Sequence, residues 1–568
     1  MKLRVTYAKR SYKDRTYVTP LVQYSYRDEQ GTPRHKTVVS LAQLPAYVVK
    51  VIDEALKQGD TRALATYAPV SSFRYERAVS LGPAWVSYQV MRQIGIVGAV
   101  QSHLTLAQTV AALAFIQERV TAERPLSVSA LQRSFAESPF RWIVGTSKPP
   151  SLNIWYAALR SLEQHRPAIL TALYQSAPKP FRVFLYDITS SYFEGTCCPL
   201  AAFGYNRDGK KGKKQVVIGV IADAEGRPVW CDVFQGNTSD QMTVRDQLLV
   251  LRDQLQVTEF IFVGDRGMVT SARIDELDQE GWWERFTYIT ALKRQELLRI
   301  AQDDQHPLQP ELVDHHHLVE VTHEGVRYVM CYNPHRQQED AATRERLLAL
   351  TEEKLHAITT SVNTGRLKHK AAIARRLHRW LNRWGMERFF QVSYDEGHFS
   401  AVRKRAEIDR YAKLDGCYVI RSNVEQAHLA PEQLQQQYKD LKYVEQVFRT
   451  MKTTDIAVRP IRVWTEQHVR GSIFGCFLAY RVIWEIRQRL TPVLTRHEKN
   501  HTNEVGSLQE VWRNLGTISA GIFSLNGTRQ VDLSTLSARH KQLLTLLNIP
   551  EVTLADIRGM CQGQGERV

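Results

Sequence analysis

The alternation of apolar and polar residues changes its period several times along this chain, and each change marks an expected element. Residues 16–26 alternate apolar and polar side chains, a turn cluster follows at 28–33, and residues 36–41 are extended again, which predicts an N-terminal β-hairpin. From about residue 82 to 176 the apolar residues recur at helical spacing. Helices are expected at 84–94, 106–118, 127–136 and 154–174.

From residue 181 the pattern changes to short, nearly continuous apolar runs that are typical of buried strands. Strands are expected at 181–189, 216–222, 228–234, 259–264 and 285–292, with helices near 242–256 and 271–279. Strands that give way to alternating strands and helices predict an α/β domain, in which a mixed sheet is covered by helices.

A segment of different patterning interrupts this core. We interpret it as an α+β insertion that holds one hairpin, a charged helical pair from 337 to 384 and a second hairpin, after which the core resumes at 416–422. The expected domains are 1–60 (hairpin and helix), 80–176 (helical), 177–300 (first part of the core), 301–415 (insertion), 416–490 (second part of the core) and 491–568 (C-terminal helical tail).

Composition adds a basic surface to this picture. The 568 residues carry a net charge of +16, which suits a polyanionic partner, although a merely basic protein without such a partner would look the same. Seven Cys without metal-binding spacing indicate a reduced, cytoplasmic chain. No apolar stretch follows Met1, so we expect no signal peptide. The longest apolar run, 472–484, is too short to span a bilayer and contains Arg481, so we expect no membrane partner.

Three carboxylates stand out against the apolar pattern. Asp187 lies near the end of the first expected core strand, and Asp265 follows the fourth. An unpaired carboxylate in such a place costs several kcal/mol, so it needs a partner or a metal ion. Residues 438–452 are expected to form one amphipathic helix whose polar face places Glu445 among Tyr438, Arg449 and Lys452. Taken alone, the helix is better explained as a solvated face with a Glu–Arg pair four residues apart, but all three carboxylates together form a possible metal cage.

The motifs around these carboxylates resemble those of bacterial insertion-sequence transposases of the DDE type. The first two motifs read Tyr186-Asp187-Ile-Thr-Ser-Ser and Val263-Gly-Asp265-Arg-Gly. The third matches the Tyr-x2-Arg-x3-Glu-x6-Lys signature of one branch, the insertion sequence family four type, through Tyr438, Glu445 and Lys452. Leu441 stands at the signature Arg position and is the one departure. The resemblance extends over about residues 180 to 490.

This resemblance implies an RNase H-like catalytic core in which the first and fourth strands lie side by side. It implies that Asp187, Asp265 and Glu445 are the catalytic residues and ligate Mg²⁺ or Mn²⁺, and that Tyr438, Arg449 and Lys452 contact phosphates. By the same resemblance the partner is double-stranded DNA, both transposon ends and target, which is cut and then joined by strand transfer. The family further implies a homodimer that brings two ends together, and an end-binding role for residues 80–176.

Two basic segments are further DNA-binding candidates. A Gly-punctuated loop between the first two core strands carries Lys210, Lys211, Lys213 and Lys214, although it is also readable as a flexible surface loop. The second helix of the insertion carries Arg375, Arg376 and Arg379 near two tryptophans. Cations interleaved with aromatic residues suit backbone binding with base stacking, and the alternative is that Trp380 and Trp384 belong to the core of the insertion.

Other conspicuous residues are given structural interpretations. The three histidines 315–317 are expected in a loop, and Trp282 and Trp283 in the core or against an extruded base. The exposed carboxylates are expected to include Asp208, Asp223, Asp232 and Asp246, and Asp240 is a candidate for supporting the site. Two rival functions remain open: an RNase H-like, metal-dependent nuclease without strand transfer, and a catalytically inactive DNA-binding descendant of a transposase.

Overall fold

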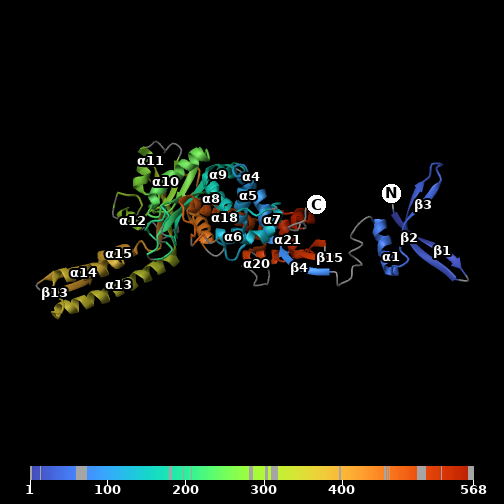
Figure 1. Cartoon of the computed structure of the whole chain (residues 1–568). Coiled ribbons are helices and arrows are strands. Elements are labelled where there is room, and N and C mark those ends of the chain that lie inside the picture. Colours follow the sequence, from blue (N-terminus) through green and yellow to red (C-terminus); the bar gives the residue numbers. More distant parts are fainter. Residues whose placement is uncertain are drawn as a thin grey trace. The chain divides into compact units, whose positions relative to one another are not determined.

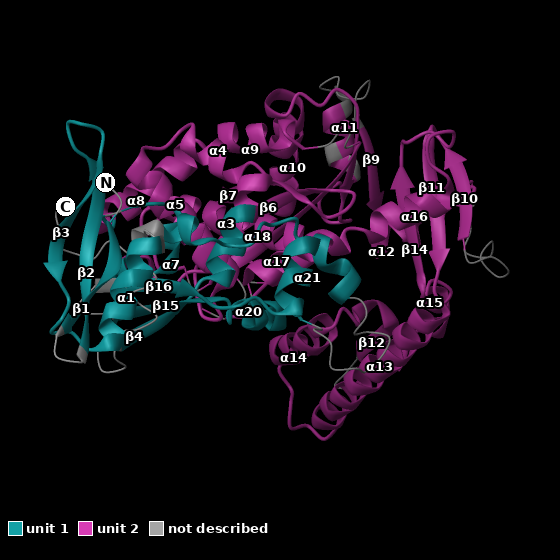
Figure 2. Cartoon of the chain, turned by 90° about the vertical axis from the view of Figure 1, so that its right-hand side faces the viewer, with its two compact units in different colours: residues 1–89, 133–149, 489–568 teal, residues 90–132, 150–488 magenta. Residues whose placement is uncertain are grey.

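The computed structural model divides the chain into two compact units (Figures 1 and 2). Unit 1 consists of Met1–Gln89, Arg133–Pro149 and Arg489–Val568, and unit 2 consists of Val90–Gln132 and Pro150–Gln488. The structure describes residues 3–12, 15–58, 73–146, 148–177, 182–195, 197–205, 207–210, 212–279, 286–300, 303, 305–308, 318–395, 398–452, 456, 458–459, 461–494, 507–525 and 528–560. Trp282, Trp283 and the histidines 315–317 lie outside this described part.

An eight-stranded mixed sheet forms the centre of unit 2. In order across the sheet, its strands are β10 (Leu318–His323), β11 (Val326–Tyr332), β14 (Cys417–Ser422), β9 (Phe286–Ala291), β8 (Phe260–Gly264), β5 (Val183–Tyr192), β6 (Gln215–Asp223) and β7 (Pro228–Phe234). The pairs β5–β8 and β8–β9 are parallel and the others are antiparallel. The five strands β5 to β9 therefore stand in the order 3-2-1-4-5, which is consistent with an RNase H-like core. The predicted mixed sheet, with its first and fourth strands adjacent, is confirmed.

Strand burial explains why the core strands were readable from the sequence. All nine residues of β6 are buried, because helices cover the sheet and leave no polar face. Among these helices, α16 (Pro431–Lys439) contacts β8 and β9, and α17 (Lys442–Lys452) contacts β5 and β6. Further helices are α10 (Asp240–Leu249), extended by a π-helical turn over Val250–Gln254, α11 (Ser271–Gln279) and α12 (Arg294–Ile300).

Unit 2 also contains α4 (Ile96–Gln101), α5 (Leu106–Thr121), α8 (Leu152–Gln164), α9 (Arg166–Gln175) and most of α18 (Glu466–Leu494), whose apolar middle is buried. Gly475 and Gly471 of α18 lie against α5 and α8. Two further helices, α3 (Gly82–Gln93) and α6 (Val128–Ser134), each contain a boundary between the units. The single helix predicted over 154–174 is divided between α8 and α9, because Pro167 suits the first turn of a helix and not its interior. Within the described residues, no helix is long and apolar enough to cross a membrane.

The helical pair of the predicted insertion forms an arm with its own small core. It comprises α13 (Pro334–Asn363), α14 (Lys370–Arg383), the hairpin β12 (Phe390–Asp395) and β13 (His398–Arg403), and α15 (Arg405–Ala412). Leu348, Leu355 and Leu381 are buried in it, and Trp380 and Trp384 pack partly buried against its clusters. The first hairpin of the predicted insertion is different, since β10 and β11 join the large sheet through the β11–β14 pairing.

The described residues of unit 1 form two three-stranded sheets. The first contains β1 (Leu3–Tyr12), β2 (Arg15–Arg27) and β3 (Pro33–Ser40), against which α1 (Ala46–Gln58) packs. The sequence analysis found β2 and β3 but missed β1, whose basic residues hid the strand. The second sheet pairs β4 (Phe73–Ser80) with the hairpin β15 (Ser519–Leu525) and β16 (Thr528–Leu533).

The C-terminal segment therefore differs from the helical tail that was expected. Its predicted helices are present as α20 (Leu508–Leu515) and α21 (Ala538–Leu546). The hairpin between them was missed because its buried positions, including Ala520 and Ile522, are few and flank the strand-weakening Gly521.

Candidate active site

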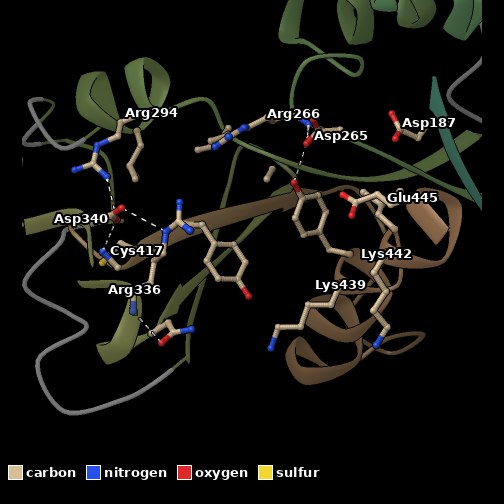
Figure 3. Close-up of a pocket in the computed structure, with 18 residues that line it drawn as sticks. Asp187, Asp265, Arg266, Arg294, Arg336, Asp340, Cys417, Lys439, Lys442 and Glu445 are labelled. Atoms are coloured by element: carbon tan, nitrogen blue, oxygen red, sulfur yellow. Dashed lines mark hydrogen bonds and ion pairs between the residues drawn. The ribbon is translucent and has the colours of Figure 1, made fainter. Parts of the chain in front are cut away.

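The parallel pairing of β5 with β8 brings the two strand-end aspartates together. Tyr186 is the cross-strand partner of Gly264, so Asp187 and Asp265 follow at the same level of the sheet. Glu445 lies on α17, which packs on β5. All three line one cavity of about 710 Å³. Figure 3 shows Asp187, Asp265 and Glu445 on one side of it and Arg294, Arg336 and Asp340 on the other.

The helix that carries Glu445 is shorter than predicted. The expected single helix over 438–452 is wrong, because a turn at Asp440 and Leu441 separates α16 from α17. Asp440 ends α16, and its buried carboxylate accepts a hydrogen bond from Gln436 at 2.7 Å, which stabilises the break. Within α17 the expected apolar face is buried through Val444, Val447, Phe448 and Met451.

Tyr438 is consequently on a different helix from Glu445, yet it reaches the site. Its hydroxyl donates a hydrogen bond to Oδ1 of Asp265 at 3.2 Å. The same oxygen accepts the backbone N–H of Arg266 at 2.8 Å. Tyr438 therefore fixes the orientation of the second carboxylate, which differs from the phosphate contact that the sequence analysis expected of it.

The three carboxylates interact electrostatically. The pKa of Asp187 is raised from 3.8 to about 7, mainly by burial and in part by the negative charges of Asp265 and Glu445. The backbone N–H of Ile188, which donates to Asp187 at 2.7 Å, and the guanidinium of Arg207 lower it. The ionised form of the site is thus unfavourable without a compensating positive charge.

By donor chemistry, the residues fit a divalent cation. The ligands are carboxylate oxygens only, which suit Mg²⁺ or Mn²⁺ and not zinc. The described residues contain no cluster of three His, Cys, Asp or Glu side chains already arranged around one point. Asp265 is held by Tyr438, and Asp187 by its neighbouring N–H, so the carboxylates have to turn towards a shared ion.

Lys452 forms an ion pair with a buried carboxylate. Its Nζ lies 2.9 Å from Oδ1 of Asp208, and Nη1 of Arg459 lies 2.6 Å from the same oxygen. The Asp208 side chain is only 2% exposed, so the expectation of an exposed carboxylate was wrong. Burial lowers the pKa of Lys452, while the ion pair with Asp208 opposes that change. Lys452 and the exposed Arg449 do not line the cavity.

Of the other three aspartates that were expected at the surface, one is buried, one is half-buried and one is exposed. Asp223 is buried at a turn, where it accepts the backbone N–H groups of Glu225 and Arg227, and Asp232 binds Arg166 at 2.7 Å. Asp246 is exposed as predicted. Asp223 is thus held by its own turn, whereas Asp232 is paired with an arginine on α9, far along the chain, which a local pattern does not reveal.

Arg207 is a site residue that the sequence analysis did not single out. It binds Asp240 at 2.7 Å, and its charge favours ionised Asp187. Asp240 thus supports the site through Arg207. In the basic loop Lys210 is exposed, Lys213 pairs with Glu194 at 2.6 Å and Lys214 is half-buried. Lys211 lies outside the described residues.

Five cations also line the cavity and were missed: Arg266, Arg294, Arg336, Lys439 and Lys442. Arg294 and Arg336 lie across the cavity from Glu445, whereas Arg266, Lys439 and Lys442 lie on the side of the carboxylates (Figure 3). Arg294 and Arg336 reach Asp340 at 3.9 and 3.3 Å, and Arg294 also binds Asp415 at 3.0 Å. Only Lys439 and Lys442 had a sequence signal, because they flank Leu441 at the signature Arg position.

The arginines predicted on the insertion lie away from the cavity, on α14. Arg375, Arg376 and Arg379 are all exposed, and in the described part of the chain none has an ion-pair partner. Trp380 and Trp384 pack against the core of the arm, and the guanidinium of Arg383 lies over both rings. The tryptophans therefore have a structural role, whereas the positive charges of the three arginines are exposed on α14.

Comparison with known proteins gives one family match. Residues 178–482 match the model of the family described as "Transposase DDE domain". No curated protein sequence matches the chain. A solved structure, the cryo-EM structure of the piggyBac transposase synaptic complex with hairpin DNA, is 10% identical in sequence, with a TM-score of 0.34. That similarity covers 76% of this chain and 75% of the other.

Proposed function

The chain belongs to the family of proteins with a transposase DDE domain, and from this premise we propose that it is a DNA transposase. It binds the ends of a mobile element, cleaves them and joins them to target DNA. The observation that supports this proposal is the cavity that Asp187, Asp265 and Glu445 share, which is also lined by five cationic side chains. Residues of these types at one cavity suit phosphodiester chemistry, in which negative charge develops on oxygen.

The catalytic roles follow from the placement of each group. Divalent cations, when bound, activate the attacking oxygen and stabilise the leaving one. Asp187 and Asp265, whose backbone positions are set by adjacent strands of the sheet, would provide two ligands, and Glu445 would provide the third from α17. Tyr438 orients Asp265, and Arg207 favours the ionised form of Asp187.

DNA binding extends beyond the cavity in this proposal. Arg266, Arg336, Lys439 and Lys442 attract the phosphates nearest the reaction, since they line the cavity and carry positive charge. Other backbone contacts come from Arg449, the lysines of the basic loop and the arginines Arg375, Arg376 and Arg379. Lys452 acts indirectly, by holding Asp208.

We also propose membership of the bacterial branch with the Tyr-Arg-Glu-Lys signature, and a homodimer on paired ends. The signature spacing supports the branch through Tyr438, Glu445 and Lys452. Leu441 lines the cavity without a charge, and the flanking Lys439 and Lys442 supply positive charge in its place.

The test uses purified protein, labelled DNA carrying the element's ends and a plasmid target, with Mg²⁺ or EDTA. We expect Mg²⁺-dependent joining of the label to the plasmid, and its loss in Glu445→Ala. Glu432→Ala, an exposed carboxylate on α16, is the matched control and should retain joining. Cleavage without joining would indicate a nuclease, and binding without cleavage in Mg²⁺ or Mn²⁺ an inactive descendant.

A further inference from the structure

Two large aromatic rings stand exposed beside the candidate active site. Phe203 is 66% exposed and Tyr205 is 84% exposed, and both lie in the segment between β5 and β6. Aromatic side chains of this size are usually buried at least in part. An exposed pair therefore calls for an explanation, either as a chance feature of a flexible loop or as a contact surface.

The backbone of this segment is not free to move. Gln215, 2% exposed, donates its backbone N–H to Ala202 at 2.9 Å and its side-chain amide to the carbonyls of Tyr205 and Gly236, at 3.1 and 2.8 Å. A Cβ at Gly204 would lie 2.2 Å from the carbonyl oxygen of Gly236, so only glycine fits between the two rings. The rings are thus presented by a fixed scaffold, which reduces the entropy cost of binding.

The same segment leads directly to the carboxylates. The guanidinium of Arg207 lies 6.0 Å from the centre of the Tyr205 ring. The backbone N–H of Arg207 donates a hydrogen bond to the hydroxyl of Ser190 at 3.0 Å. Ser190 is three residues after Asp187 on β5, which corresponds to about 10 Å along a strand. Asp208, the residue after Arg207, pairs with Lys452 at 2.9 Å, and Lys452 ends α17, the helix that carries Glu445.

Charge indicates what the rings bind. Arg207, Lys210, Lys213 and Lys214 follow them in the chain, so the surface suits a polyanion better than an apolar protein partner. In an intact duplex the bases are stacked on each other, and aromatic side chains stack on bases that are unpaired. We propose that Phe203 and Tyr205 stack on unpaired bases of the DNA strand held at Asp187, Asp265 and Glu445.

This inference rests on the proposed function and adds a substrate preference, namely DNA with unpaired nucleotides next to the reacting phosphate. Binding is measured with the full chain in EDTA, so that it does not depend on catalysis. The probes are a fluorescein-labelled duplex with a short unpaired 3′ tail and the same duplex with a blunt end. A tail containing 2-aminopurine reports stacking directly through quenching of its fluorescence.

We expect the protein to bind the tailed duplex about tenfold more tightly, or more, and to quench 2-aminopurine. Phe203→Ala/Tyr205→Ala should lose both effects and keep its affinity for the blunt duplex. Phe203→Tyr/Tyr205→Phe retains the rings and should retain both effects. Tyr47→Ala, which removes a 67% exposed ring on α1, is the control for loss of an exposed aromatic side chain and should change neither.

Three results would overturn the proposal. They are an equal affinity of the wild type for both duplexes, an unchanged preference in the double alanine variant, and loss of self-association in that variant with DNA binding intact. The last would mark a protein interface. Failure of the transposase proposal appears separately, as absence of Mg²⁺-dependent cleavage, and does not affect this binding comparison.

Discussion

The ammonium group of Lys452 lies 2.9 Å from the buried carboxylate of Asp208. Lys452 ends the helix that carries Glu445, and Asp208 belongs to the loop that carries the exposed aromatic rings. Oδ2 of Asp208 also accepts the backbone N–H of Tyr192 at the end of β5. One buried carboxylate therefore connects the helix, the loop and the strand on which the candidate site is built.

Replacement of Asp208 should lower the free energy of unfolding of unit 2. Asp208→Asn leaves Lys452 and Arg459 without their counter-charge, and we expect a loss of roughly 2–3 kcal/mol, below the ~3–5 of a fully buried pair because Arg459 is 30% exposed. Urea unfolding measures the change. Glu407→Gln removes the exposed pair with Arg410 and should cost less than about 1 kcal/mol. Equal effects of both variants would contradict the assigned role.

The raised pKa of Asp187 predicts a pH-dependent stability. Because its pKa is about 7 in the folded protein and 3.8 ordinarily, the folded state binds the additional proton between these values. Stability contributed by this group is therefore lost as pH rises through that window. In EDTA, Asp187→Asn should raise Tm at about pH 8, and the gain should shrink towards about pH 4. A gain independent of pH would show that ionisation is not the cause.

Removal of the Tyr438 hydroxyl should weaken the response to metal. Tyr438→Phe leaves Asp265 without the hydrogen bond that orients it, and groups that orient metal ligands typically contribute 10–100-fold in affinity or activity. We expect the Mg²⁺ concentration for half-maximal cleavage to rise by about tenfold or more. Tyr443→Phe, on the neighbouring helix, removes a hydroxyl outside the cavity and should have no effect. An unchanged Mg²⁺ response in Tyr438→Phe would exclude this positioning role.

The exposed arginines of α14 should contribute to the salt dependence of DNA binding. Each phosphate contact adds about 0.9 to the slope of log affinity against log salt concentration, so Arg375→Ala/Arg376→Ala/Arg379→Ala should lower it by up to about 2.7. Arg346→Ala, an exposed arginine on α13 of the same arm, should leave the slope unchanged. A triple variant with the wild-type slope would remove α14 from the interface.

A single added methyl group should displace the aromatic rings. Gly204→Ala introduces a clash with the Gly236 carbonyl, and we expect loss of the preference for the tailed duplex with both rings still present. Gly98→Ala on α4 meets nothing within 4 Å and should be neutral or stabilising by up to about 1 kcal/mol. If Gly204→Ala retained the preference, the fixed backbone would not matter to binding.

Site residues could be predicted from the sequence where a local pattern marks them, and could not where their partners lie far away in the sequence. The three carboxylates were predictable, because each interrupts a local apolar pattern: Asp187 and Asp265 at strand ends, and Glu445 on an amphipathic helix. The parallel register that brings the aspartates together followed from the expected fold.

Residues whose roles depend on distant partners were not predictable. Asp208 binds a lysine 244 positions away, so nothing in its neighbourhood marks it as buried. Arg294 and Arg336 line the same cavity from two different helices, α12 and α13. The break between α16 and α17 at Asp440 was missed for a different reason, because the helical pattern of polar and apolar residues continues across it.

The two ends of the arm, at Asn333 and Gly416, lie next to each other. Tyr332 and Cys417 are cross-strand partners, and between them the N–H of Asn333 donates to the carbonyl of Gly416 at 3.0 Å. Gly416 has a φ of +73°. Direct joining of Asn333 to Gly416 would leave an Asn-Gly two-residue loop, a preferred turn for closing a β-hairpin. The arm therefore occupies the position of a hairpin turn between β11 and β14, and a chain shortened by residues 334–415 would be able to close the sheet with an Asn-Gly turn.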